Sequence, residues 1–333
     1  MVPHQEKSGN DAAGGQAAQS HVPVLLREIV DLLAPKPGDT VLDCTAGRCG
    51  HAAAFAERIG PTGTLILFDL DPANLAYAAE RIAQLPHPPR VIAHHASFAD
   101  APRLLKPDSM AANIMLADLG FASNQVDDPR RGFSFSRDGP LDMRLNPQAP
   151  IPASELVNTL PERELAELIR DFGEEPWPEA RRIAAKVVSE RARTPIETTA
   201  QLASIVRSAI PVWRAAQSSI HPATKTFQAL RIAVNDELGS LERLLGSIER
   251  AAVGIGGGSS GTGSGSWLSP GARVGIIAFH SLEDRPVKRC FSSLVERGLA
   301  AELTRKPVTA SDEEIASNPR SRSAKFRAVR IGG

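Results

Sequence analysis

Short apolar segments that alternate with helical patterns constrain the fold of this chain more than any other feature of its sequence. Four segments have the length and apolar content of buried strands: residues 40–43, 64–69, 90–93 and 113–118. Helical patterns at residues 50–59 and 71–83 separate the first three of them. Strands connected in this way run parallel in one sheet, because each crossover returns the chain to the same edge. The sequence therefore predicts an α/β fold with a mostly parallel, doubly wound, Rossmann-like sheet.

A run of helical patterns without intervening strands follows the fourth strand. Polar and proline-containing residues 121–152 lead into three amphipathic segments, at residues 162–172, 179–192 and 199–210. We interpret residues 127–217 as a small helical domain inserted into the α/β domain.

The α/β pattern resumes after this insertion. An apolar stripe from Thr224 to Leu245 has spacings of three and four residues and predicts one continuous helix that covers the sheet. Residues 273–279 and 324–331 are expected to form two further strands. We therefore assign the main domain to residues 21–126 and 218–333.

Two polar segments are predicted to lack regular structure. Residues 1–20 carry neither an apolar signal core nor an arginine-rich targeting pattern, and we interpret them as a disordered tail. The Gly/Ser tract at residues 254–266 is expected to be a flexible surface loop. No segment approaches the about 18 apolar residues of a membrane span, so we predict a cytoplasmic protein without membrane contact.

Charge and cysteine content restrict the possible partners and metals. Lys plus Arg and Asp plus Glu both total 38, so a nucleic-acid site would have to be a local basic patch. Residues 318–330 contain Arg320 and Arg322 and no acid, which is consistent with phosphate contact or with a solvated face. The three cysteines form neither a CxxC pair nor a Cys/His cluster of zinc-ligand spacing, so no metal site is predicted.

The loop after the first strand carries the strongest local signal for a ligand. Residues 41–51 read as a strand end, a small-residue loop and a helix start, where free N–H groups and glycines let a ligand approach. Asp69 ends the second strand at the place where dinucleotide folds position an acid that binds ribose hydroxyls. An ordinary βα turn is the alternative, and the absence of G-x-G-x-x-G disfavours a nicotinamide oxidoreductase. Asp71 is fully explained as a helix N-cap.

Three further residues follow predicted strands. Asp118 and the loop 118–121 could orient an amino group on a base, or Asp118 could merely cap the loop. Phe98 suits an adenine contact, and a core phenylalanine is the alternative. His280 ends a strand at the same sheet edge, where either a functional role or simple strand closure would account for it.

Several segments together resemble the ribosomal RNA small-subunit methyltransferase H (MraW) family, and the resemblance spans almost everything after the tail. The segments are HVPVLL at residue 21, DCTAGRCGH at 43, GFSFSRDGPLDMR at 132, HPATKTFQ at 221, FHSLEDR at 279 and NPRSRS at 318. The resemblance implies a class I methyltransferase fold that uses S-adenosylmethionine to methylate the N4 amine of a cytidine in the decoding region of small-subunit (16S) rRNA. A ribosomal particle is the implied substrate.

The resemblance also implies site residues. The cofactor contacts it implies are Cys49, Gly50, His51, Asp69, Phe98, Asp118 and Gln125. For the substrate we add three residues of the 132–144 loop and three from the C-terminal part of the chain: Arg137, Asp142, Arg144, His280, Arg320 and Arg322. The inserted domain would recognise RNA, and Asp118 is the candidate for orienting the amine. The chain departs from the family pattern at Cys49, usually glycine, and at residues 121–124, usually of Val-Ser-Ser-Pro type.

Two alternatives remain open at this stage. One is cytosine-N4 methylation of another nucleic acid. The other is a noncatalytic RNA-binding or ribosome-assembly protein, which the departures at Cys49 and residues 121–124 motivate.

Overall fold

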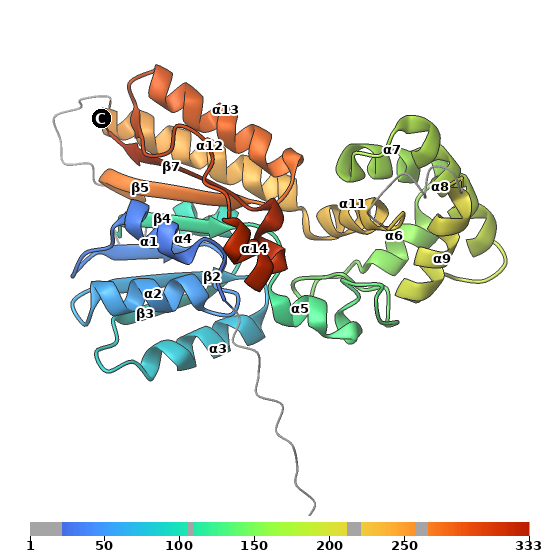
Figure 1. Ribbon diagram of the computed structural model, residues 1–333, viewed down its shortest axis with the longest axis horizontal. Coiled ribbons are helices and arrows are strands. Elements are labelled where there is room, and N and C mark those ends of the chain that lie inside the picture. The colour runs from blue at the N-terminus through green and yellow to red at the C-terminus, as the bar shows by residue number, and fades with distance from the viewer. Residues whose placement is uncertain (1–21, 106–109, 212–220, 257–265, 333) are drawn as a thin grey trace, which may run out of the picture.

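The computed structural model describes residues 22–105, 110–211, 221–256 and 266–332. Within these residues a seven-stranded sheet has the order β3-β2-β1-β4-β5-β7-β6 (Figure 1). Its strands are β1 Thr40–Asp43, β2 Thr64–Asp69, β3 Arg90–His95, β4 Ala112–Asp118, β5 Leu268–Ala278, β6 Ala300–Glu302 and β7 Lys325–Ile331. The first five strands are parallel, and β7 runs antiparallel to both β5 and β6. The predicted Rossmann-like, mostly parallel sheet is confirmed.

Both faces of the sheet are covered, which explains why its strands read as apolar runs rather than as an alternating pattern. On one face, Val41 and Leu65 pack with α1 Leu26–Leu33, α2 Gly50–Ile59 and α3 Pro72–Ala83. On the other face, Leu42 and Ile66 pack with α4 Ala101–Leu105, α12 Glu237–Gly256 and α13 Ser281–Glu296. The parallel register brings the carboxyl ends of β1, β2 and β4 to one edge of the sheet.

The helices inserted after β4 have a hydrophobic core of their own and lie to one side of the sheet (Figure 1). They are α6 Ala153–Thr159, α7 Glu162–Gly173, α8 Trp177–Arg191, α9 Thr199–Ala209 and α11 Thr224–Asn235. Leu165, Ile183, Leu202 and Phe227 are among the buried side chains that join them. Between β4 and these helices lie α5 Ser123–Asp127 and a short 3-10 turn, Pro129–Arg131.

The prediction of one sheet-covering helix from Thr224 to Leu245 was wrong. The chain forms two helices, because Asp236 adopts a left-handed backbone conformation with φ +47° that ends α11. Only α12 packs on the sheet, whereas α11 packs against α7. The predicted boundary at residue 217 would therefore separate α11 from the helices on which it packs.

Smaller differences concern the ends of elements. Gly254 to Gly256 form the last turn of α12 rather than a loop, and residues 257–265 of the predicted loop lie outside the described residues, as does the predicted tail. Three short elements were not predicted, namely α6, β6 and α14 Asp312–Ser317. None of the described helices combines the length and the apolar character that crossing a membrane requires.

Candidate functional site

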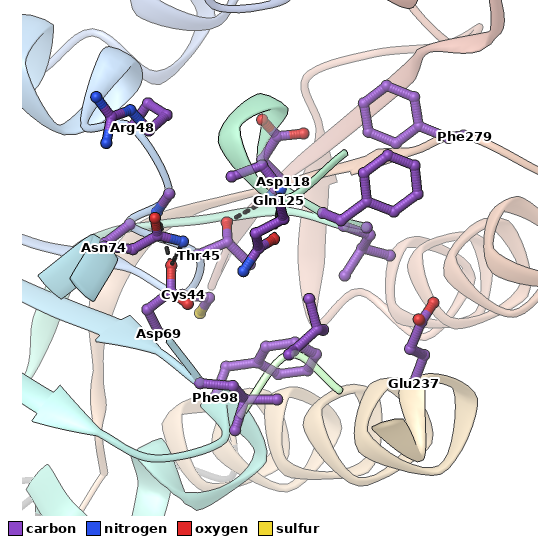
Figure 2. Close-up of a pocket in the computed structure, with 18 of the residues that line it drawn as sticks. Cys44, Thr45, Arg48, Asp69, Asn74, Phe98, Asp118, Gln125, Glu237 and Phe279 are labelled. Carbon is purple, nitrogen blue, oxygen red and sulfur yellow. Dashed lines mark hydrogen bonds between the residues drawn. The ribbon is translucent and has the colours of Figure 1, made fainter. Parts of the chain in front are cut away.

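A cavity of about 450 Å³ lies at the carboxyl edge of β1, β2 and β4, where parallel α/β sheets bind their ligands (Figure 2). The loop after β1, the end of β2 and the residues Ser97 and Phe98 form one part of its wall. The segment from Asp118 to Ser123 and the ends of α11 and α12 form the other. Its volume is within the range of about 300 to 1,000 Å³ that small-molecule sites occupy.

The loop after β1 reaches the cavity through Thr45 to Arg48, but Cys49 does not line it. Cys49 has φ +62°, is fully buried, and places its Sγ 3.7 Å from the carbonyl oxygen of Ala78. Burial raises the pKa of this thiol to about 12, so the thiol stays protonated. The residue therefore affects the site through its backbone conformation.

Gly50 begins α2 against the segment that precedes α1. A Cβ atom at this position would lie 2.4 Å from Cγ of Pro23, so no larger residue fits without a shift. His51 is tied to the same segment, because its Nε2–H donates to the carbonyl oxygen of Val24 at 2.9 Å. The motif at residues 21–26 thus packs against the start of α2 and supports the loop that precedes this helix.

Asp69 fixes the geometry of this loop from the end of β2. Its carboxylate accepts hydrogen bonds from the backbone N–H of Gly47 at 2.8 Å and of Asp71 at 2.8 Å, and from the Asn74 amide at 3.2 Å. Burial raises its pKa to about 6. Three acceptor positions are thereby used, which leaves capacity for one more donor, such as a ligand hydroxyl.

Asp118, at the end of β4, is the least satisfied acid of the cavity. Its backbone N–H donates to Oγ1 of Thr45 at 2.8 Å, and one carboxylate oxygen lies 3.7 Å from Nδ1 of His51. The other oxygen, Oδ1, is buried without a hydrogen-bond partner among the described residues. Burial raises the pKa of Asp118 to about 8, with further contributions from the charges of Asp43 and Glu283. Such a carboxyl group is available to a ligand that brings a hydrogen bond.

Phe98 and Gln125 both line the cavity, and they do so in different ways. Phe98 starts a 3-10 turn capped by Ser97 and offers a partly buried ring. Gln125 is buried, and its amide accepts from the Ala122 N–H at 2.8 Å and donates to Asp71 at 3.1 Å.

Asp71 does more than cap α3. Besides accepting from the Ala73 N–H, it forms a buried ion pair of 2.6 Å with Arg131. The hydrogen bonds from Arg131 and Gln125 outweigh burial and lower its pKa. Asp71 therefore ties the loop after β4 to the end of β2, a role that the N-cap interpretation did not include.

The wall opposite Asp69 and Asn74 combines two aromatic residues with an arginine and a glutamate. Glu237 and Phe279 lie on this side of the cavity (Figure 2). Arg231 reaches Glu237 with two hydrogen bonds of 2.8 Å, and Phe121 lies 4.7 Å from the Arg231 guanidinium. Burial raises the pKa of Glu237. No motif indicated Arg231 or Glu237, because these two residues meet only through the turn between α11 and α12.

His280 stands next to this wall rather than in it. Its Nε2 lies 3.2 Å from Glu283, whose other oxygen accepts from the Phe279 N–H at 2.8 Å. A carboxylate oxygen or a ring nitrogen from each of Glu237, His280 and Glu283 lies within 4.8 Å of the other two. Such atoms can bind a metal ion. The carboxylates of Glu237 and Glu283 already have partners in Arg231, His280 and the Phe279 N–H, so this cluster is explained without a metal.

Comparison with known proteins shows to which family this chain belongs. The sequence pattern of the MraW methylase family matches residues 18–331. The chain belongs to this family. A relative from Acidobacterium capsulatum, named Ribosomal RNA small subunit methyltransferase H, is 45% identical, with 93% of this chain and 98% of that protein covered. A relative of the same name from Koribacter versatilis is 46% identical, with 93% of each chain covered.

The remaining residues predicted to contact the substrate lie at different distances from the cavity. Arg320 lines it and is paired with Asp127 at 2.8 Å, and Arg137 donates to the carbonyl oxygen of the same Asp127. Asp142 and Arg144 bind each other at 2.6 Å. These two residues shape the loop 132–144 rather than the cavity wall.

Arg322 is exposed, is not part of the cavity wall, and has no hydrogen-bond or ion-pair partner among the described side chains. It follows Arg320 in the 3-10 turn Pro319–Ser323.

Proposed function

We propose that this protein uses S-adenosylmethionine to methylate the N4 amine of a cytidine in the decoding region of small-subunit rRNA, within a ribosomal particle in the cytoplasm. The names of the relatives support rRNA as the substrate class, since they are called Ribosomal RNA small subunit methyltransferase H. The single observation that carries the reaction type is Asp118, a partly buried acid whose Oδ1 has no hydrogen-bond partner among the described residues, at the junction of the two parts of the cavity wall.

The residues at the sheet edge fit S-adenosylmethionine. Asp69 retains acceptor capacity for ribose hydroxyls, Phe98 offers an apolar face for adenine, and Gly47 brings its backbone close to Asp69. Gly50, His51 and Gln125 complete this part of the site, and Cys49 contributes through the turn before α2. When bound, S-adenosylmethionine supplies a methyl group activated by a positively charged sulfur.

The chain itself has to orient a weak nucleophile. The lone pair of the cytosine amine is delocalised into the ring, so its reaction depends on alignment and on an acceptor for its N–H. Asp118 is that acceptor in our proposal, and Thr45 holds its backbone in place. Phe121 and Phe279 offer apolar surfaces to a base that has left its stack.

The surrounding surface would bind the RNA. In our proposal the inserted helices, Arg137, Arg320 and Arg322 bind the RNA, and of these arginines Arg320 lines the cavity itself. Arginines at such positions bind phosphates without reading sequence, which suits a large RNA substrate.

The proposal is tested by offering labelled S-adenosylmethionine with small-subunit particles, protein-free rRNA or DNA, and by mapping the label on digested nucleosides. We expect label in N4-methylcytidine from rRNA, and its loss in Asp118→Ala, with thermal unfolding showing that this variant is folded. Label in DNA alone would contradict the substrate, and full activity of Asp118→Ala would contradict the role of that residue. Binding of rRNA without any cofactor binding or methyl transfer would favour a noncatalytic assembly protein.

A further inference from the structure

The turn between α11 and α12 brings an arginine and a glutamate together at the cavity wall. Asp236 ends α11 in the left-handed conformation, and α12 starts at once with Glu237. This reversal allows Arg231, six residues before Glu237, to meet it with Nε and Nη2, each at 2.8 Å from a carboxylate oxygen. Both side chains are largely buried and both line the cavity.

The pairing uses only one edge of the guanidinium group. A guanidinium carries five N–H bonds, and Glu237 accepts two of them. The other three, on Nη1 and Nη2, have no acceptor among the described residues. Glu237 and the ring of Phe121 fix the plane of the group, so the free edge is held in a defined orientation.

The charges around this free edge indicate what kind of ligand it takes. Glu237 binds Arg231 directly, and Glu283 lies close enough for the charge of Arg231 to lower its pKa. Two carboxylates around one arginine disfavour an anion such as a phosphate group. A neutral, planar ligand with two adjacent acceptors fits the free edge better, and the nearby Phe121 and Phe279 suit a flat ring.

The N3–O2 edge of cytosine has these properties, because both atoms are acceptors and N3 is bonded to the carbon that carries the amine. We propose that Arg231 determines base specificity by donating to this edge of the target cytosine, and that Glu237 is the residue that positions Arg231. The inference rests on the proposed function and adds to it the residue that distinguishes cytosine from adenine. Adenine carries a C–H group where cytosine has O2, so it would leave one donor unpaired.

The test combines changes in the protein with changes in the substrate. Methyl transfer is measured for wild type, Arg231→Met and Arg231→Lys on an RNA whose target residue is cytidine, 3-deazacytidine or 2-thiocytidine. The first analogue lacks the N3 acceptor, and the second replaces O2 by a weak acceptor. We expect wild type to prefer cytidine by about 10- to 100-fold in kcat/KM, the range for a paired contact of this kind. Both variants should lose a similar factor on cytidine and show little further loss on the analogues.

Arg231→Lys keeps the charge but not the planar fork, so it should behave like Arg231→Met. Glu237→Gln should reduce the preference for cytidine partially, while Arg250→Met, an exposed arginine on α12, should leave it unchanged. Melting temperature and S-adenosylmethionine affinity are measured for each variant.

The outcomes separate the two proposals. Variants that slow transfer by the same factor on all three RNAs would overturn the role of Arg231 and leave the proposed function intact. Wild-type protein that transfers no methyl group to cytidine would overturn the proposed function itself, and the inference with it. If Arg231→Met does not fold, the comparison of Arg231→Lys with wild type decides.

Discussion

At the scale of single residues, the partly buried acid Asp118 links the proposed function to stability. Its pKa is raised to about 8, by burial first and then by the charges of Asp43 and Glu283. In the unfolded chain the pKa of the same group lies near its ordinary value of 3.8. Its contribution to stability is therefore complete below about pH 4 and is lost as the pH rises through 8, because only the folded state keeps the proton in that interval.

Asp118→Asn removes the ionisable group, and with it the loss of stability at high pH, while keeping the size of the side chain. We expect the variant to be more stable than wild type at pH 8.5, and the difference in melting temperature to shrink toward pH 4. Thermal unfolding at several pH values measures this difference. For domains of about 150 to 250 residues, each kcal/mol of stability changes the melting temperature by about 2 to 4 °C. Asp31→Asn, at an exposed aspartate, serves as control. A difference independent of pH would contradict the assignment.

The contact of Gly50 with Pro23 gives a second prediction at this scale. Gly50→Ala would place Cβ 2.4 Å from Cγ of Pro23 and should destabilise the protein by about 1 to 3 kcal/mol, with weaker cofactor binding. Pro23→Ala removes that Cγ, so the double variant should recover part of the loss. Denaturant unfolding of the two single variants and the double variant measures the coupling. Losses that simply add would show that the two residues do not interact.

At the scale of elements, the sequence predicted those parts of the sheet whose apolar runs end at clear polar or glycine signals. The bounds of β1, β2 and α2 agree with the prediction, since Asp43, Asp69 and Gly60 follow or end the buried runs. The turn at Asp236 was missed because the apolar spacing continues across it through Val234, Leu238 and Leu241. The spacing of apolar residues does not reveal a single residue with a left-handed backbone conformation.

The residues of the candidate site likewise include some that the sequence predicted and some that it did not. Residues that directly follow strands, such as Asp69 and Asp118, could be placed at the sheet edge from the sequence, and both line the cavity. Arg231 and Glu237 could not, since they meet only through the turn that the apolar pattern conceals. Cys49 was expected at the cofactor, but its side chain is buried against Ala78 instead.

The left-handed turn at Asp236 should be measurable as a backbone preference. Asp236→Gly should be at least as stable as wild type, because glycine adopts φ +47° without the cost of a Cβ, while Asp236→Val should lose about 1 to 3 kcal/mol. Both variants remove the exposed ion pair with Arg243, which makes them a matched pair. Denaturant unfolding measures the difference. Equal stability of the glycine and valine variants would contradict a strained turn.

At the scale of the whole molecule, equal numbers of acidic and basic residues mean that the proposed RNA binding would depend on local arginines rather than on net charge. Arg320 is paired with Asp127, whereas Arg322 has no partner among the described side chains. Arg322 is therefore free to neutralise a phosphate without first breaking an ion pair. The two arginines should thus contribute unequally, although they lie two residues apart in one 3-10 turn.

Arg322→Ala should lower the slope of log K against log salt concentration for small-subunit rRNA by about 0.7 to 0.9, the value for one lost phosphate contact. Arg320→Ala should change the slope less, because the pairing with Asp127 already offsets part of its charge. Arg250→Ala, on an exposed part of α12, should leave the slope unchanged. Binding titrations between low and physiological salt measure all three. A slope unaltered by Arg322→Ala would mean that the C-terminal basic segment is a solvated face, and that the inserted helices carry the electrostatic part of RNA binding.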